Sequence, residues 1–144
     1  MVEPFLWNDA FAVGETGLDA EHRRMVELIN EICIHSREGI GSLLRELQFV
    51  SEMHFRNEET VLARIAAEIN QKHLQTEVWL AIEQHARQHR RQLDKLQDLV
   101  ACTDDHEICE MLKLWYVEHV VREDAEVKAI LQSTSHMVDA SGDG

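Results

Sequence analysis

The sequence predicts an all-α protein, an up-down-up-down antiparallel four-helix bundle preceded by an extended N-terminal arm. Apolar residues recur at spacings of three and four through four segments of the 144-residue chain. Short polar connectors separate those segments, as in antiparallel bundles. No stretch of useful length alternates apolar and polar residues as a half-buried strand would. The length suits one domain, and a content of 44% apolar and 28% charged residues is typical of a globular chain.

The arm spans residues 1–18, where aromatic residues are mixed with glycines, and we expect it to be extended and ordered. The first helix is predicted over residues 19–36, with Asp19 as its N-terminal cap. One face of this helix carries Leu18, His22, Met25, Ile29 and Ile32. Gly39 and Gly41 are expected to end the helical pattern.

The second helix is predicted over residues 43–69, with Ser42 as its cap, and residues 70–76 are expected to form a polar connector or a weak helical joint. The third helix is predicted over residues 77–101. The fourth is predicted to follow Thr103 and Asp104 and to reach residue 131. The bundle therefore covers residues 19–131, and the polar tail over 132–144 is expected to fray. The inner faces of these three helices carry Leu43, Leu47, Val50, His54, Glu58, Val61 and Ile65; Val78, Ile82, His85, His89, Leu93, Leu96 and Val100; and Ile108, Leu112, Trp115 and His119.

Charge and cysteine content exclude several classes of function. The chain has 14 Lys and Arg against 27 Asp and Glu, a net charge of −13, so nucleic acid and anionic membrane surfaces are poor partners. No apolar run approaches the ~18 residues of a membrane span, and the N-terminal residues do not resemble a secretory signal. Cys33, Cys102 and Cys109 are odd in number and form no CxxC pair. We therefore expect reduced thiols that serve packing in a cytoplasmic protein.

Histidines and a carboxylate interrupt the inner face of every predicted helix. The six inward polar residues are His22, His54, Glu58, His85, His89 and His119. An unpaired buried polar group costs about 1–3 kcal/mol, and a bare carboxylate costs more. Each motif alone is weak evidence for a site, because His-x3-His and His-x3-Glu pairs are common on helix surfaces. Their convergence from four helices favours a metal site, since imidazole suits iron, zinc and copper and carboxylates can bridge two ions.

Asp124 follows His119 by five residues, and on a regular helix that separation turns through about 140° away from the starting face. Periodicity alone would therefore make Asp124 a solvated acid. It reaches the inner face only from the flank or through a local π-bulge, a feature that tends to occur at functional sites.

Four stretches together resemble the bacterial hemerythrins, non-haem di-iron proteins. GETGLDAEHRRMVELIN resembles the first-helix signature of that family, HFRNEE the second, HARQH the third and WYVEHVVRED the fourth. The resemblance extends from Trp7 to Asp124, nearly the whole chain. All seven family ligand positions carry the expected residue types in the expected order: His22, His54, Glu58, His85, His89, His119 and Asp124.

The resemblance implies two iron ions, cycling between Fe2+ and Fe3+, with an oxo or hydroxo bridge. One iron would take His85, His89 and His119, and the other His22 and His54, while Glu58 and Asp124 bridge the pair. The two-histidine iron would then have a vacant position for dioxygen. The implied function is reversible dioxygen binding by a carrier, store or delivery protein, without enzymatic turnover. Candidate wall residues are Phe55 and Trp115, for which a plain core role is equally expected.

Two features depart from the family pattern. Between Glu58 and His85 lie 26 residues, more than the family pattern leads us to expect, so the flanking helices are extended or the connector carries an insertion. His73 and Glu77 repeat the His-x3-Glu spacing in this region and are interpreted as surface residues. Tyr116 stands where an aliphatic residue is expected, and its hydroxyl is a candidate for contact with the oxygen pocket. The remaining histidines, His35, His106 and His136, match no ligand position and are expected to face solvent.

Three alternative functions differ in how well this sequence supports them. A di-iron oxidase or peroxidase of the ferritin-like class would need Glu-x-x-His pairs, and no histidine here has Glu three residues before it. A sensing module would report oxygen, redox state or nitric oxide to a protein partner through the same di-iron site. A metal-free interaction bundle would leave the inward imidazoles unexplained.

Overall fold

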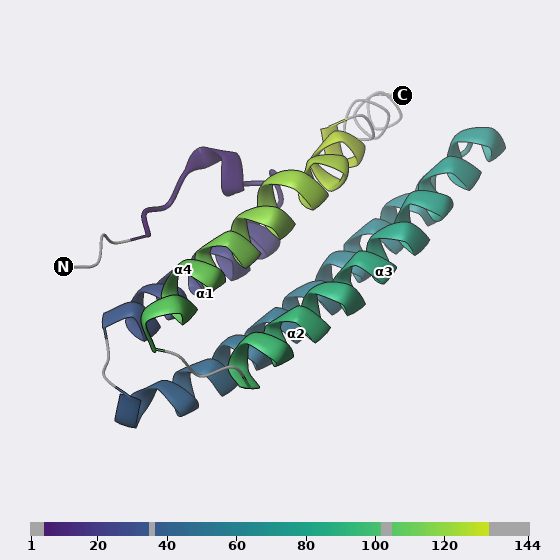
Figure 1. Cartoon of the computed structure of the whole chain (residues 1–144). Coiled ribbons are helices and arrows are strands. Elements are labelled where there is room, and N and C mark those ends of the chain that lie inside the picture. The colour runs from purple at the N-terminus through teal and green to yellow at the C-terminus, as the bar shows by residue number, and fades with distance from the viewer. Residues whose placement is uncertain (1–4, 35–36, 102–104, 133–144) are drawn as a thin grey trace.

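The protein is described here by a computed structural model that covers residues 5–34, 37–101 and 105–132, without the side chains of residues 37–39, 105 and 106. Four long helices lie antiparallel in a bundle (Figure 1): α1 (Thr16–Ile34), α2 (Arg37–Glu68), α3 (Lys72–Ala101) and α4 (Asp105–Val117). The fourth helix continues through the π-helical segment η2 (Glu118–Glu123) into helical residues 124–132. The predicted four-helix bundle is confirmed. The N-terminal arm, with the short 3-10 helix η1 (Asp9–Phe11), runs along the outside of the α1 and α4 pair.

Helix α1 begins three residues earlier than predicted, and Asp19 is not its cap. The Glu15 carboxylate accepts a hydrogen bond from the backbone N–H of Leu18 at 2.6 Å and so satisfies the first turn. Asp19 lies inside the helix, and its carboxylate accepts hydrogen bonds from the backbone of Val13 at 2.7 Å and Gly14 at 3.3 Å. Gly14 has a φ of +97°, a conformation that favours glycine. Asp19 therefore holds the turn that leads out of the arm.

The predicted break at Gly39 and Gly41 is wrong, because α2 begins at Arg37 and contains both glycines and Ser42. Each glycine costs a helix about 1 kcal/mol relative to alanine. Burial of Leu44 and Leu47 in the core outweighs that local preference. The connection between α1 and α2, at residues 35–36, lies outside the described residues.

The long region between Glu58 and His85 is accounted for by longer helices. Helix α2 ends at Glu68 and α3 begins at Lys72, so the expected connector over residues 70–76 is largely helical. The side-chain amide of Gln75 donates a hydrogen bond to the carbonyl of Ala66 at 2.9 Å and closes the turn between the two helices. Helices of 32 and 30 residues result.

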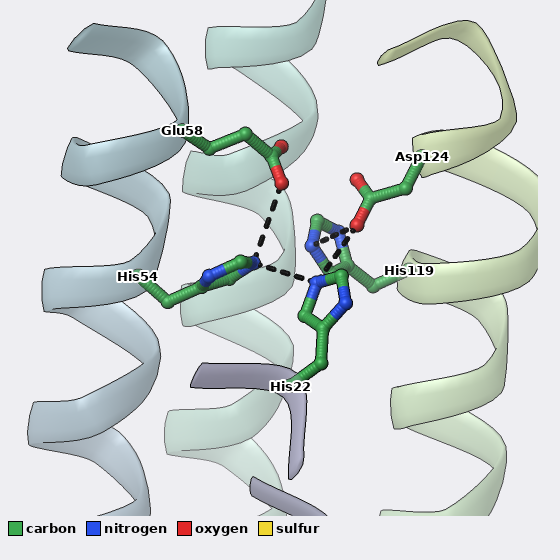
Figure 2. A group of neighbouring side chains, drawn as sticks. All are labelled: His22, His54, Glu58, His119 and Asp124. Atoms are coloured by element: carbon green, nitrogen blue, oxygen red, sulfur yellow. Dashed lines mark hydrogen bonds and ion pairs between the residues drawn. The ribbon is translucent and has the colours of Figure 1, made fainter. Parts of the chain in front are cut away.

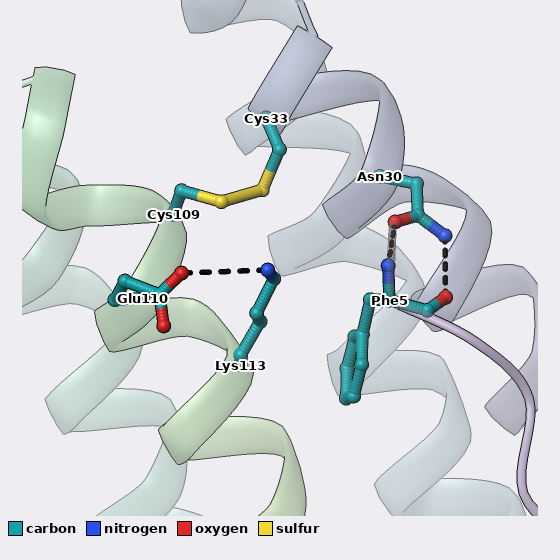
Figure 3. Close-up of a disulfide and its surroundings, with 6 residues drawn as sticks. All are labelled: Phe5, Asn30, Cys33, Cys109, Glu110 and Lys113. Atoms are coloured by element: carbon teal, nitrogen blue, oxygen red, sulfur yellow. Dashed lines mark hydrogen bonds and ion pairs between the residues drawn. A yellow bond between two sulfur atoms is a disulfide. The ribbon is translucent and has the colours of Figure 1, made fainter. Parts of the chain in front are cut away.

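A disulfide bond joins Cys33, at the end of α1, to Cys109, near the start of α4 (Figure 3). Their Cα atoms lie 5.2 Å apart although 76 residues separate them in the chain. The prediction that these two cysteines are reduced thiols is therefore wrong, and the thiol argument for a cytoplasmic location no longer holds. Cys102 lies outside the described residues. No helix in the described ranges combines the length and hydropathy needed to cross a membrane.

Two apolar clusters fill the bundle, one on each side of the inward histidines. The large cluster contains aromatic as well as aliphatic side chains, and the small cluster is entirely aliphatic. Buried members of the large cluster are Phe11, Met25, Val26, Leu28, Ile29, Ile32, Leu44, Leu47, Phe55, Leu96, Ile108, Leu112, Trp115, Tyr116 and Val120. The small cluster consists of Val13, Leu18, Leu62, Ala66, Val78, Ile82 and Val127. On each helix the candidate ligands mark the boundary between the two.

Candidate metal centre

All seven side chains predicted as ligands meet at one buried point between the two apolar clusters. Each is at most 2% exposed. Figure 2 shows five of them pointing toward one another from three sides of the bundle: His22, His54, Glu58, His119 and Asp124. His85 and His89 of α3 complete the set. Their ligand atoms form two groups, and within each group the atoms lie within 4.8 Å of one another.

Regular helical spacing positions the ligands of α2 and α3. His54 and Glu58 are separated by four residues on α2, and His85 and His89 by four on α3, so each pair projects from one face.

Asp124 joins the site because the fourth helix contains a wider turn. The backbone N–H of Asp124 donates to the carbonyl of His119, five residues earlier, at the end of the π-helical segment η2. This geometry brings both side chains to the same face although a regular α-helix would separate them. Of the two routes open to Asp124, the structure therefore contains the π-bulge.

On one side of the site His22 is the central contact. Its Nε2 lies 2.9 Å from Nε2 of His54 and 3.2 Å from Oδ2 of Asp124. Nε2 of His54 lies 3.3 Å from Oε2 of Glu58. Two imidazoles and two carboxylates therefore turn their ligand atoms toward a shared centre rather than toward solvent.

On the other side Glu58 is the central contact. Its Oε1 is the partner of His85 Nε2 and lies 2.9 Å from His89 Nε2. Asp124 presents Oδ1 to His85 at 3.2 Å and Oδ2 to His119 Nε2 at 3.3 Å. Glu58 and Asp124 thus contact imidazoles on both sides, and they are the two residues common to both ligand groups.

Four of the five histidines are held from outside the cluster by a hydrogen bond at Nδ1. The acceptors are the Phe11 carbonyl for His22 (2.7 Å), Glu21 for His54 (3.1 Å), Gln88 for His85 (3.0 Å) and Glu59 for His89 (3.2 Å). Because these oxygens accept, each Nδ1 carries a proton, and Nε2 is the ring nitrogen that each histidine turns inward. Such outer partners fix the orientation of metal-binding imidazoles.

None of these four acceptors was predicted from the sequence. Glu21 precedes His22 and Glu59 follows Glu58, so adjacency to a candidate ligand was the available signal. Gln88 lies one turn beyond His85 on α3. Nothing in the spacing points to Phe11, whose backbone oxygen carries no side-chain signature.

Charge in the metal-free cluster is balanced between imidazoles and carboxylates. Burial by itself lowers the pKa of His54, but the hydrogen bond to Glu21 and the nearby Glu58 carboxylate outweigh it and raise the pKa to about 9. The pKa of His85 rises to about 10, because the nearby carboxylates of Asp124 and Glu58 likewise outweigh burial. The imidazoles hold the pKa of Glu58 well below its usual range and lower that of Asp124, although burial opposes both shifts. A metal cation entering the site must displace protons from these imidazoles.

Several buried atoms of the cluster lack a hydrogen-bond partner. They are Oε2 of Glu58, both ring nitrogens of His119 and both carboxylate oxygens of Asp124. Buried polar atoms are nearly always paired, so this concentration at one point indicates a missing partner. All of them can donate a lone pair to a cation, and imidazole with carboxylate is a suitable ligand set for iron. The residues present therefore fit a metal centre.

Aromatic residues line the cluster, with different contacts. The Phe55 ring stacks on His89 at 4.3 Å and meets His119 at 4.6 Å, so it forms a wall of the site as well as part of the core. The indole of Trp115 donates to the Gln92 carbonyl at 2.9 Å. The Tyr116 hydroxyl donates to the His22 carbonyl at 3.3 Å, so it faces the α1 backbone rather than the ligand atoms.

The second His-x3-Glu pair lies on the surface, as predicted. The His73 side chain is 91% exposed and that of Glu77 is 60% exposed, and they form a pair with each other at 3.1 Å. The side chains of the remaining three histidines, His35, His106 and His136, lie outside the described residues.

The chain is similar to a known family of cation-binding domains. Residues 13–131 match the family model of the hemerythrin HHE cation binding domain. A hemerythrin-like protein of Naegleria gruberi is 28% identical over 131 residues, which cover 89% of this chain and 94% of that protein. A bacteriohemerythrin of Clostridium acetobutylicum is 28% identical over 137 residues (85% and 97%), and a myohemerythrin of Riftia pachyptila is 27% identical over 128 residues (89% and 94%). The chain belongs to the hemerythrin family.

Proposed function

We propose that this chain holds two iron ions in the buried cluster and binds dioxygen reversibly, as a carrier or store and not as an enzyme. The observation that carries the proposal is the convergence of five imidazoles and two carboxylates on one buried point, with their Nε2 and carboxylate oxygens turned inward. Family membership supports iron as the metal.

The two shared carboxylates are suited to bridging, because Glu58 and Asp124 each present an oxygen to both sides of the cluster. His22 and His54 would hold one iron, the one expected to bind dioxygen, and His85 and His89 would hold the other. We assign His119 to the second iron as the family resemblance implies, although its Nε2 also groups with those of His22 and His54. When bound, ferrous iron would supply the electrons that dioxygen takes up on binding and returns on release.

The residues of the chain supply orientation and buried surroundings. Outer hydrogen bonds hold four imidazoles in one tautomer. Phe55 covers His89 and His119 with an apolar ring, which keeps water from that side of the centre. An imidazole-rich set also differs from the carboxylate-rich sets of ferritin-like di-iron oxidases, and this difference supports binding over turnover.

The test is metal analysis and absorption spectroscopy of the full chain after anaerobic reconstitution with ferrous iron. We expect about two iron ions per chain, and in air a near-ultraviolet and visible charge-transfer absorption that disappears on deoxygenation. Occupancy by zinc or copper alone in the presence of iron would contradict the proposal. An absorption that appears in air but does not reverse would contradict reversible binding and favour an oxidase.

The surface pair provides matched controls for the ligands. His54→Ala should abolish the oxygen-dependent absorption and Glu58→Gln should lower iron content, because each removes a buried ligand atom. His73→Ala and Glu77→Gln make the same chemical changes in a pair of the same spacing that is exposed, and both should leave iron content and spectrum unchanged. A Glu58→Gln protein that retains all its iron and its reversible spectrum would exclude the bridging role.

A further inference from the structure

His22 differs from the other histidines of the site in the origin of its outer partner. The acceptor for its Nδ1–H is the backbone carbonyl of Phe11, at 2.7 Å, in the N-terminal arm. The partners of His54, His85 and His89 all come from the bundle helices. The match to the hemerythrin family model begins at residue 13, so this contact lies just outside the matched segment.

The arm is anchored on both sides of Phe11. Before it, the Asn30 side chain pairs with the backbone of Phe5: Phe5 N–H donates to Oδ1 at 2.6 Å, and Nδ2 donates to the Phe5 carbonyl at 2.7 Å (Figure 3). After it, the Asp19 carboxylate accepts from the N–H groups of Val13 and Gly14. Both anchors belong to α1, the helix that carries His22.

Between the anchors the arm covers His22 with aromatic side chains. The Phe11 ring packs edge-to-face against Phe5 (5.7 Å), Trp7 (5.6 Å) and Tyr116 (5.0 Å). Tyr116 in turn lies 6.3 Å from the His22 ring. Phe11 is buried, and Arg23 lies over Trp7 at 4.7 Å. The carbonyl that holds His22 therefore lies under a layer that excludes water, which would otherwise compete for the hydrogen bond.

We propose that the N-terminal arm is part of the metal site, with Asp19 and Asn30 as positioning residues that act on His22 through it. Both hold the arm so that the Phe11 carbonyl fixes the proton of His22 on Nδ1 and directs Nε2 to the centre. Because a carbonyl only accepts, this hydrogen bond selects one tautomer and one ring orientation. The consequence for iron rests on the proposed function, whereas the effect on the His22 ring does not.

The first experiment uses the metal-free full-length protein and nitrogen-15 NMR of the histidine side chains. The wild-type protein should show His22 with its proton on Nδ1. Asp19→Ala, Asn30→Ala and the double variant should show a mixture of tautomers or a mobile ring, while His85 and His89 keep their signals. Asp19→Asn, which keeps one acceptor oxygen, should restore the wild-type His22 signal in part. Asn70→Ala, a matched substitution of an exposed asparagine between α2 and α3, should change nothing.

The second experiment measures the rate at which a chelator removes iron from the loaded protein. Loss of outer partners typically costs 10–100-fold in metal affinity, so each anchor variant should lose iron up to that much faster. The effect of the double variant on the rate of iron loss should be smaller than the two single effects combined, because both changes release the same arm. Unchanged His22 signals in the double variant, or strictly additive effects on iron loss, would overturn the proposal. If the wild-type chain binds no iron, the proposed function fails while the NMR result still decides the role of the arm.

Discussion

The two apolar clusters on either side of the histidines differ in kind. The large cluster contains aromatic rings, is covered by the N-terminal arm, and lies at the end where a disulfide joins α1 to α4. The small cluster contains Val, Leu, Ile and Ala and lies toward the turn between α2 and α3. All four helices pass through both clusters and through the histidine layer between them.

This difference indicates how a bundle can accommodate a costly polar layer. One end is built as a rigid core with large rings, a covalent bond and an arm, and so fixes the positions of the four helices. The other end then needs only simple aliphatic contacts to hold the ligands in register. We infer that the large cluster supplies most of the stability of the metal-free protein, and the following predictions test that inference.

The largest effect is expected from leucine truncation in the two clusters. Leu112 of the large cluster and Leu62 of the small one are almost equally buried. Leu→Ala changes in cores cost about 2–5 kcal/mol. Leu112→Ala should fall near the upper limit, because rings around it collapse poorly into a cavity, and Leu62→Ala near the lower one. Urea unfolding of the metal-free variants measures both costs. Equal costs would mean that the two clusters contribute alike, and a greater cost for Leu62→Ala would mean that the small cluster contributes more. Either result would contradict the inference.

The disulfide should contribute the next largest effect. A cross-link across a long loop typically stabilises by about 2–4 kcal/mol, and this one spans 76 residues. The double variant Cys33→Ala, Cys109→Ala should therefore unfold at lower denaturant concentration. A thiol reductant should destabilise the wild-type protein by a similar amount and leave the double variant unaffected. If a thiol reductant leaves the unfolding of the wild-type protein unchanged, the disulfide does not contribute to the difference in stability between the two clusters.

The pH dependence of the metal-free protein tests the layer between the clusters. The raised pKa values of His54 and His85 contribute stability that is complete below about 6.5 and is lost as pH rises through about 9 and 10. The lowered pKa values of Glu58 and Asp124 contribute stability that is lost as pH falls below their usual range. We expect greatest stability between about pH 4.5 and 6.5, as measured by urea midpoints across pH. A urea unfolding midpoint that rises between pH 6.5 and 10 would contradict the stabilising role of the protonated His54 and His85.

The smallest effect is expected from Tyr116→Phe. The substitution removes one buried hydrogen bond, to the His22 carbonyl, and keeps the ring against Phe5 and Phe11. Such a bond contributes about 0.5–1.5 kcal/mol. Because the hydroxyl faces the α1 backbone, the oxygen-dependent spectrum of the iron-loaded protein should not change. A changed spectrum at unchanged stability would mean that the hydroxyl reaches the oxygen pocket.

Much of the architecture could be predicted because it depends on periodicity. Spacings of three and four residues gave the bundle and placed His54, Glu58, His85 and His89 on inner faces. Periodicity alone made Asp124 a solvated acid, and only the family resemblance placed it among the ligands. Of the two routes left open, from the flank or through a wide turn, the structure contains the wide turn. The roles of all seven residues as ligands remain a prediction.

Some features could not be predicted, because they depend on tertiary contacts or on local preferences that compete with such contacts. Asp19 was predicted to cap α1, but Glu15 accepts the hydrogen bond of its first turn and Asp19 binds the backbone of the arm instead. The weak helix propensity of Gly39 and Gly41 was outweighed by core burial further along α2. The disulfide required knowledge of which helix ends are neighbours. The partner of His22 is a backbone oxygen, and every residue of the chain has one.

The wide turn in the fourth helix sets the orientation of both Asp124 and Val127, two residues that have no evident connection in the sequence. Beyond it, Asp124 points into the histidine layer and Val127 into the small cluster. If η2 straightened into regular α-helix, every later residue would rotate by about 100°, and the carboxylate and the valine would leave the interior together. The chain therefore keeps its last ligand in place partly by packing a hydrocarbon side chain one turn further on.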